Sequence, residues 1–360
     1  MVAGMLDIAG VYLGENADFS EGDAHNSKGY WEHARLHDLN DRLLAHLGGS
    51  HDRPPDLAYG WERDASLDPF YVEANSLIAS VFGGRSLWAW KSPPVSLTIP
   101  FWQRVVPDLR FILCTRNPLD FASSVLAYQG MGGKHARALW LYHTINVLKN
   151  TRSSERFVCH FESFFPDYGE TLSSLLDFIG TPCTLENPSV QARLASFHDS
   201  GMKHHSSSLT DLLSSNEVYY DVKETYLQLL AGPPDASEVP IVAQSELFMP
   251  LLQRMIVAET NILARYSDSV FQSIDGRESP SQTQAIIERK LREADRERRH
   301  LQSILNSRTH RIAAAICEML IRLRSVRTGS KNPARDSFVY GTAHEPENAP
   351  MATNKERVAN

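Results

Sequence analysis

The chain has 360 residues, of which 42% are hydrophobic and 22% are charged, and its formal net charge is −7. This composition excludes a wholly disordered chain, a collagen and a low-complexity polymer, and the length allows about two domains. No apolar run reaches the ~18 residues that a membrane-spanning helix needs. The four cysteines, Cys114, Cys159, Cys183 and Cys317, lie far apart without a C-x-x-C pair. This spacing predicts neither a disulfide framework nor a zinc site, and it favours a cytoplasmic location.

The spacing of apolar residues predicts alternating helices and strands in the first half of the chain. In chain order these are a helix over 1–14, a helix over 32–47, a strand over 86–91, a helix that ends at 106, a strand over 110–115, a helix over 134–152 and a strand over 157–161. Strands that alternate with helices in this way are typical of a parallel sheet covered on both faces. The sequence therefore predicts an α/β fold.

The second half of the chain has a helical pattern and then a change of composition. We expect a single domain over 1–266, a linker over 267–282, a helical arm over 283–327 and a disordered tail over 328–360. Residues 288–327 hold eleven Lys and Arg against five Asp and Glu. This arm fits a coiled coil that makes a homo-oligomer, a peripheral contact with the inner face of a membrane, or a solvated helix. The acidic body and the lack of a recognised binding motif argue against a nucleic-acid partner.

Two basic residues stand where predicted strands end. Lys91 ends one strand, and Arg116 follows another just before a helix that begins at Pro118. Ligands bind at the carboxyl ends of parallel strands, where helix N-termini present free N–H groups, so these cations predict an anion site. Ser124 follows eight residues after Arg116, and an arginine with a hydroxyl commonly holds a terminal phosphate. Each residue alone is equally compatible with a surface salt bridge or an ordinary helical serine.

The joint pattern resembles the sulfotransferase family, in particular bacterial members that act on carbohydrates or other small acceptors. The pattern consists of Lys91-Ser92-Pro93, Pro107-Asp108, the strand over 110–115, Arg116-Asn117-Pro118, Ser124, Lys28-Gly29-Tyr30-Trp31-Glu32 with Leu39-Asn40-Asp41, and Phe161-Glu162. The resemblance covers about residues 1–265. It implies a P-loop-like three-layer fold with a short parallel sheet. It also implies transfer of a sulfuryl group from 3′-phosphoadenosine 5′-phosphosulfate to a hydroxyl of the acceptor, with no metal.

The resemblance further implies roles for four residues. Arg116 and Ser124 match the arginine and serine with which the family binds the 3′-phosphate of the donor. Lys91 matches a lysine near the sulfate, and we assign it charge stabilisation. Glu32 is the favoured general base, with His33, His25 and Asp120 as rivals. An interaction with the helix macrodipole is an alternative explanation for Glu32.

One element of the family pattern is missing from these residues. The family opens with a strand and a Gly-rich loop whose backbone N–H groups cradle the 5′-phosphosulfate. Met1-Val2-Ala3-Gly4 resembles the helix that follows this loop. Without the loop we expect the sheet to lack a central strand and the donor to lack its main anchor. The alternative function is therefore a catalytically impaired, sulfotransferase-like binding or scaffold protein.

Overall fold

The computed structural model describes residues 1–19, 22, 26, 28–181, 185–199, 203, 205–231, 249, 252–253 and 256–257. The helices are α1 (Val2–Ile8), α2 (Ala34–His46), α3 (Asp68–Phe82), α4 (Val95–Val105), α5 (Pro118–Gln129), α6 (Gly133–Asn150), α7 (Tyr168–Ile179), α8 (Pro188–Phe197), α9 (Leu209–Ser214) and α10 (Tyr220–Leu230). The strands are β1 (Phe111–Thr115) and β2 (Arg156–His160). Short 3₁₀ helices cover Asn16–Asp18, Trp61–Arg63, Ala65–Leu67 and Phe161–Phe164. The expected linker, arm and tail lie outside the described residues.

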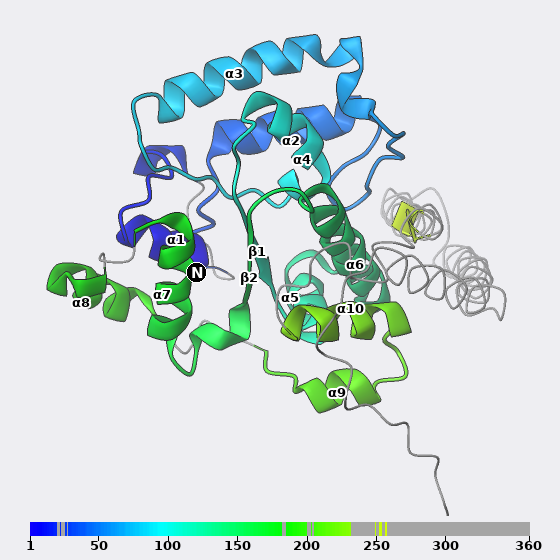
Figure 1. Ribbon diagram of the computed structural model, residues 1–360. Coiled ribbons are helices and arrows are strands. Elements are labelled where there is room, and N and C mark those ends of the chain that lie inside the picture. The colour runs from blue at the N-terminus through cyan, green and yellow to red at the C-terminus, as the bar shows by residue number, and fades with distance from the viewer. Residues whose placement is uncertain are drawn as a thin grey trace, which may run out of the picture. The chain divides into compact units, whose positions relative to one another are not determined.

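Strands β1 and β2 form a parallel pair at the centre of the described part, with Phe111 opposite Arg156 and Thr115 opposite His160. Their side chains alternate between two hydrophobic cores. Ile112 packs into the core of α1, α7 and α8, whereas Leu113 packs into the core of α5, α6 and α10. Helices therefore cover both faces of the strand pair (Figure 1), which confirms the predicted α/β arrangement.

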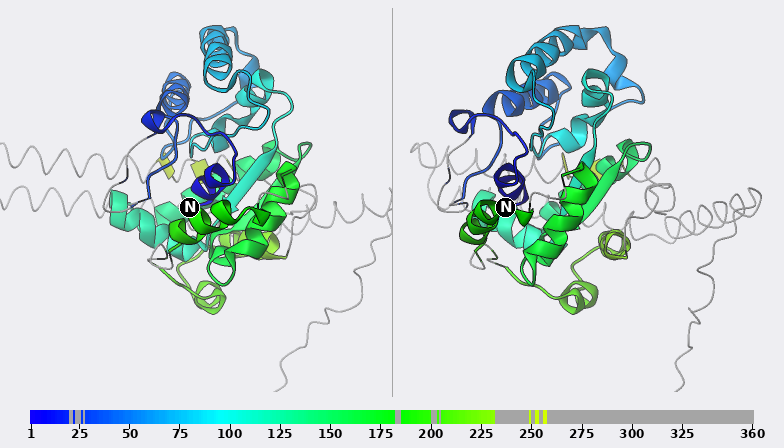
Figure 2. Two further views of the ribbon diagram at one scale, coloured as in Figure 1. Left: turned by 90° about the vertical axis from the view of Figure 1, so that its left-hand side faces the viewer. Right: turned by 60° about the vertical axis from the view of Figure 1, so that its left-hand side comes forward.

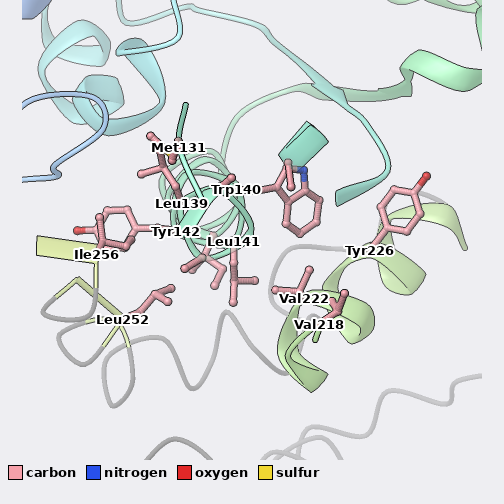
Figure 3. Packing of buried hydrophobic residues seen from close by; sticks show 14 of the residues in the cluster. Met131, Leu139, Trp140, Leu141, Tyr142, Val218, Val222, Tyr226, Leu252 and Ile256 are labelled. Carbon is pink, nitrogen blue, oxygen red and sulfur yellow. The ribbon is translucent and has the colours of Figure 1, made fainter. Parts of the chain in front are cut away.

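Helix α6 is buried on most sides because it lies against α4, α5 and α10. Its residues are apolar around much of the helix, which is the pattern of a core helix rather than of a surface helix. Trp140 of α6 packs edge-on against Tyr226 of α10, with ring centroids 6.2 Å apart (Figure 3). None of the described helices combines the length and the hydropathy needed to cross a bilayer.

Helices α2, α3 and α4 share a third core, and a buried amide joins two of them. Asn40 of α2 is fully buried, and its Oδ1 accepts hydrogen bonds from Thr98 Oγ1 at 2.7 Å and Trp102 Nε1 at 2.9 Å. Its Nδ2 donates to the Leu36 carbonyl at 2.9 Å. Because a buried polar group is costly unless it is hydrogen-bonded, Asn40 fixes α2 against α4. Figure 2 shows these helices at one end of the described part and α9 at the other.

Two sequence predictions were wrong in their details. The helix expected over 1–14 ends at Ile8, because Gly10 adopts a left-handed conformation with φ of 97° that turns the chain. The strand expected over 86–91 has a single pairing among the described residues, an isolated parallel bridge from Trp88 to Tyr12. Its apolar residues are explained by packing, since Trp88 stacks on Phe82 at a centroid distance of 4.3 Å.

Candidate functional site

The structure brings together Glu32 and Lys91, the two residues predicted to act in catalysis. The Lys91 ammonium donates to Glu32 Oε1 and, at 3.1 Å, to the backbone carbonyl of Tyr30. Glu32 lies just before the first turn of α2, and Lys91 lies just before the turn that leads into α4. The Glu32 side chain is 12% exposed and that of Lys91 is 44% exposed. The carboxylate therefore lies at the base of the site, and the ammonium lies at its rim.

His37 is a third member of this site, and sequence reasoning missed it. Its Nδ1 lies 3.1 Å from Glu32 Oε2 and 3.3 Å from Ser92 Oγ, and its Nε2 lies 3.4 Å from Asp41 Oδ2. The spacing of four residues between His37 and Asp41 on one predicted helix was the signal available in the sequence. The site is thus a carboxylate between an ammonium and an imidazole.

The charges in this site shift the pKa of both Glu32 and His37. The hydrogen bond that His37 donates to Glu32 is the main reason that the pKa of His37 is raised, and Asp41 adds to it against the effect of burial. Burial is the largest influence on Glu32 and acts to raise its pKa. His37 and Lys91 together outweigh burial, so the Glu32 pKa lies below its ordinary value. The ionised glutamate and the histidine thus favour each other's charged forms.

Two of the three rival bases lie among the described residues, and both are buried. His33 is 2% exposed at the N-terminus of α2, its Nε2 lies 3.6 Å from Asp18 Oδ2, and burial lowers its pKa. Asp120 is fully buried, and its Oδ1 accepts a hydrogen bond from the Ser207 backbone N–H at 2.7 Å. The third rival, His25, lies outside the described residues. Glu32 therefore remains the carboxylate that is placed beside Lys91.

Trp31, next to Glu32, has a positive φ of 56°, a conformation that no other described non-glycine residue adopts. Such a backbone costs free energy and persists when the surrounding contacts hold it. Here the indole Nε1 donates to the Lys28 carbonyl at 2.8 Å, and the ring packs between Phe19 and Phe197 at 5.7 and 6.0 Å. Trp31 thus acts as a packed aromatic that sets the backbone direction at Glu32.

Arg116 follows β1 and has hydrogen-bond donors without partners. Its Nε and Nη2 are buried and have no hydrogen-bond partner among the described residues. The guanidinium lies over the Phe161 ring, with its central carbon 4.6 Å from the ring centroid. Burial lowers the pKa of Arg116, and the carboxylates of Asp120 and Glu162 act in the opposite direction. Because arginine stays charged in proteins, this group can hold an anion that accepts from both nitrogens.

The backbone around Arg116 is fixed by side chains from distant segments. Glu162 Oε1 accepts a hydrogen bond from the Asn117 N–H at 2.8 Å, which ties the ends of β1 and β2 together. Asn117 Nδ2 donates to the Ser207 carbonyl at 3.0 Å, and Asp120 accepts from the Ser207 N–H. Arg116 therefore has a fixed place at the carboxyl end of the strand pair.

Ser124, the predicted partner of Arg116, lies in the middle of α5 and is half-buried. Its neighbour Ser123 donates back to the Leu119 carbonyl at 3.0 Å. The Ser124 hydroxyl, by contrast, makes no hydrogen bond within the described part of the chain, and none joins it to Arg116. The structure thus places Arg116 just before α5 and Ser124 in the middle of that helix, and it leaves the Ser124 hydroxyl without a hydrogen-bond partner among the described residues.

A cavity of about 830 Å³ lies beside β1. Its walls include consecutive residues over 110–114 and over 86–93. Successive side chains of a strand point to opposite faces, so a cavity that touches every one of these residues runs along the edge of β1. The other edge of β1 pairs with β2. Lys91 and Cys114 line the cavity, whereas Glu32, Arg116 and Ser124 lie outside its wall.

Comparison of the chain with protein-family models, with curated proteins and with solved structures finds no match. The assignment of a function therefore rests on the residues and on the geometry of the site. Among the described residues, no group of three His, Cys, Asp or Glu side chains is placed to hold a metal ion.

Proposed function

We propose that this protein is a sulfotransferase that moves a sulfuryl group from 3′-phosphoadenosine 5′-phosphosulfate to a hydroxyl of a carbohydrate or other small acceptor. The observation that carries the proposal is the Arg116 guanidinium, whose Nε and Nη2 are buried without partners at the end of β1. These two nitrogens form one edge of the planar group, which suits two parallel hydrogen bonds to a phosphate. The residues present therefore fit the 3′-phosphate of the donor.

Each site residue has a distinct task in this proposal. The donor supplies an activated sulfuryl group. Arg116 and the free hydroxyl of Ser124 hold the 3′-phosphate, and Lys91 neutralises the negative charge that develops during transfer. Glu32 accepts the proton of the acceptor hydroxyl, and His37 orients that carboxylate through Oε2.

The finer fold that we propose is the P-loop-like three-layer arrangement implied by the family resemblance. The parallel pairing of β1 with β2 and the helices on both faces of the pair (Figure 1) support it. Lys91, which the resemblance places near the sulfate, is among the residues that line the cavity beside β1. The roles expected for the C-terminal arm over 283–327 stay predictions.

Binding of the donor product, 3′-phosphoadenosine 5′-phosphate, tests the proposal by calorimetry. We expect Arg116→Ala to weaken binding by about 2–4 kcal/mol, roughly 30- to 1000-fold. Arg63→Ala is the matched control, because Arg63 is an exposed arginine outside the cavity and its ion pair is with the neighbouring Glu62 at 3.4 Å. Equal binding by the wild type and by Arg116→Ala would contradict the assigned site. No binding by either protein would favour the alternative scaffold function.

A further inference from the structure

Cys114 and Cys159 face each other across the strand pair. They are register partners in β1 and β2, and Cys159 Sγ donates a weak hydrogen bond to Cys114 Sγ at 3.4 Å. A disulfide has a sulfur–sulfur distance of about 2.05 Å, so both residues are thiols in this structure. Because hydrogen bonds between the parallel strands fix both backbones, the two sulfur atoms stay close together while β1 and β2 are paired.

The two thiols have different surroundings. Cys114 is exposed and lines the cavity beside β1, together with Lys91. Cys159 is 3% exposed and packs into the core of α1, α7 and α8. The hydrogen bond from Cys159 is the main influence that lowers the pKa of Cys114, and the N-terminal ammonium and then Lys91 add to it against burial. The same hydrogen bond, followed by burial, raises the pKa of Cys159.

We propose that Cys114 and Cys159 form a peroxide-reactive thiol pair that closes reversibly to a disulfide. The accessible Cys114 thiol first loses its proton, and the thiolate attacks one oxygen of hydrogen peroxide. The O–O bond breaks, and the hydroxide that leaves takes up the proton that the thiol lost. This leaves Cys114 as a sulfenic acid. The Cys159 thiol then attacks the Cys114 sulfur, the S–O bond breaks, and water leaves. In total two thiols are oxidised, and one hydrogen peroxide is reduced to two waters.

The geometry assigns the two steps to different residues. A small peroxide can reach Cys114 through the cavity, and the positive charges of the N-terminal ammonium and of Lys91 favour the Cys114 thiolate. Cys159 is shielded from solvent, but it lies within one short sulfur movement of Cys114. Cys114 is thus the reactive thiol, and Cys159 is the resolving thiol. This inference does not rest on the proposed sulfotransferase activity.

Oxidation of the wild-type chain by hydrogen peroxide tests the pair without any substitution. After alkylation and digestion, mass spectrometry should show a peptide that joins Cys114 to Cys159 and that dithiothreitol separates. Cys183 and Cys317 serve as internal comparisons, because they are the other two thiols of the chain. The link should form at peroxide concentrations that leave these two thiols reduced. If Cys114 oxidises no sooner than they do, or oxidises without linking to Cys159, the proposal is wrong.

Two variants separate the roles within the pair. Cys159→Ala should leave Cys114 as a sulfenic acid that dimedone traps, whereas in Cys114→Ala the buried Cys159 should stay unlabelled. Lys91→Met should slow oxidation of Cys114 several-fold while leaving the oxidation rates of Cys183 and Cys317 unchanged. Circular dichroism confirms that each variant is folded. Equal labelling of the two cysteine variants would overturn the assignment of the reactive thiol.

Discussion

Glu32 and Lys91 form an ion pair although 59 positions separate them in the sequence. The pair joins the start of α2 to the segment before α4. The second carboxylate oxygen of Glu32 faces His37, so the protonation state of the imidazole depends on the charge of Glu32. This arrangement makes His37 a reporter of the site.

Substitution of Glu32 by glutamine should lower the pKa of His37. The hydrogen bond that the imidazole donates to the Glu32 carboxylate is the largest influence that raises this pKa, and an uncharged amide removes the negative charge of the acceptor. NMR titration of the imidazole measures the shift. Asp41→Asn is the control, because Asp41 contacts the other ring nitrogen at 3.4 Å and is 49% exposed. A larger drop in Asp41→Asn than in Glu32→Gln would contradict the assigned contact.

Two adjacent serines on α5 should differ in their effect on nucleotide binding. Ser124→Ala removes a hydroxyl that is free within the described structure, so we expect binding of 3′-phosphoadenosine 5′-phosphate to weaken by about 1 kcal/mol, roughly 5-fold. Ser123→Ala removes a hydroxyl already bonded to the Leu119 carbonyl and should change affinity little. Calorimetry with both variants measures the difference. Loss of affinity in Ser123→Ala alone would remove Ser124 from the site.

Gly4 of α1 should not tolerate a side chain. A Cβ atom at this position would lie 2.4 Å from Phe197 Cζ and 2.9 Å from Trp31 Cε2. We expect Gly4→Ala to lower the free energy of unfolding by about 1–3 kcal/mol, because the two aromatic rings must move. Gly132→Ala is the control, because Gly132 has a φ of −61° and open space around its Cα. Urea unfolding of both variants measures the change, and equal stability would show that the rings relax freely.

His143 of α6 should make stability depend on pH. Its Nε2 donates to the His51 carbonyl at 2.8 Å, its Nδ1 accepts from Ser96 Oγ at 2.5 Å, and burial lowers its pKa from 6.5 to about 4. Between these pH values the unfolded chain binds the proton and the folded chain does not. The free energy of unfolding therefore falls as the pH falls through this window.

The size of the His143 effect follows from the same pKa values. Between pH 7 and pH 5 this residue should account for at most about 2 kcal/mol of lost stability. His143→Gln can keep both hydrogen bonds but cannot titrate, so its stability should fall less over that range. Denaturant unfolding at the two pH values measures the difference. Identical pH slopes in the wild type and the variant would show that the imidazole is not kept neutral.

Much of the α/β arrangement could be predicted from the sequence because β1 and β2 are short apolar runs bounded by turn residues. The family resemblance assigned Glu32 and Lys91 to one reaction, but it did not predict the ion pair between them. His37 could not be predicted in the same way. The helix predicted over 32–47 separates Glu32 from His37 by five positions, which is not a spacing that brings two side chains together on a helix, and the observed helix begins only at Ala34.

Other features depend on tertiary register, which the sequence does not reveal. Cys114 and Cys159 meet only because β1 pairs with β2 in one register, and a shift by one residue would separate them. The single bridge at Trp88 likewise could not be foreseen, because the apolar run over 86–91 suits either a strand or a buried loop. The local sequence pattern identified the apolar runs that form β1 and β2, and long-range packing determined which segments pair.

Asn40 has a consequence for how the two segments that carry Glu32 and Lys91 move in solution. Because its amide hydrogen-bonds α2 to Thr98 and Trp102 of α4, the two helices belong to one cooperative unit. We therefore expect backbone amides of α2 and α4 to exchange with deuterium at a common rate under native conditions. Local unfolding of this unit would separate Glu32 from Lys91 and would unfold α2 and α4 in the same event.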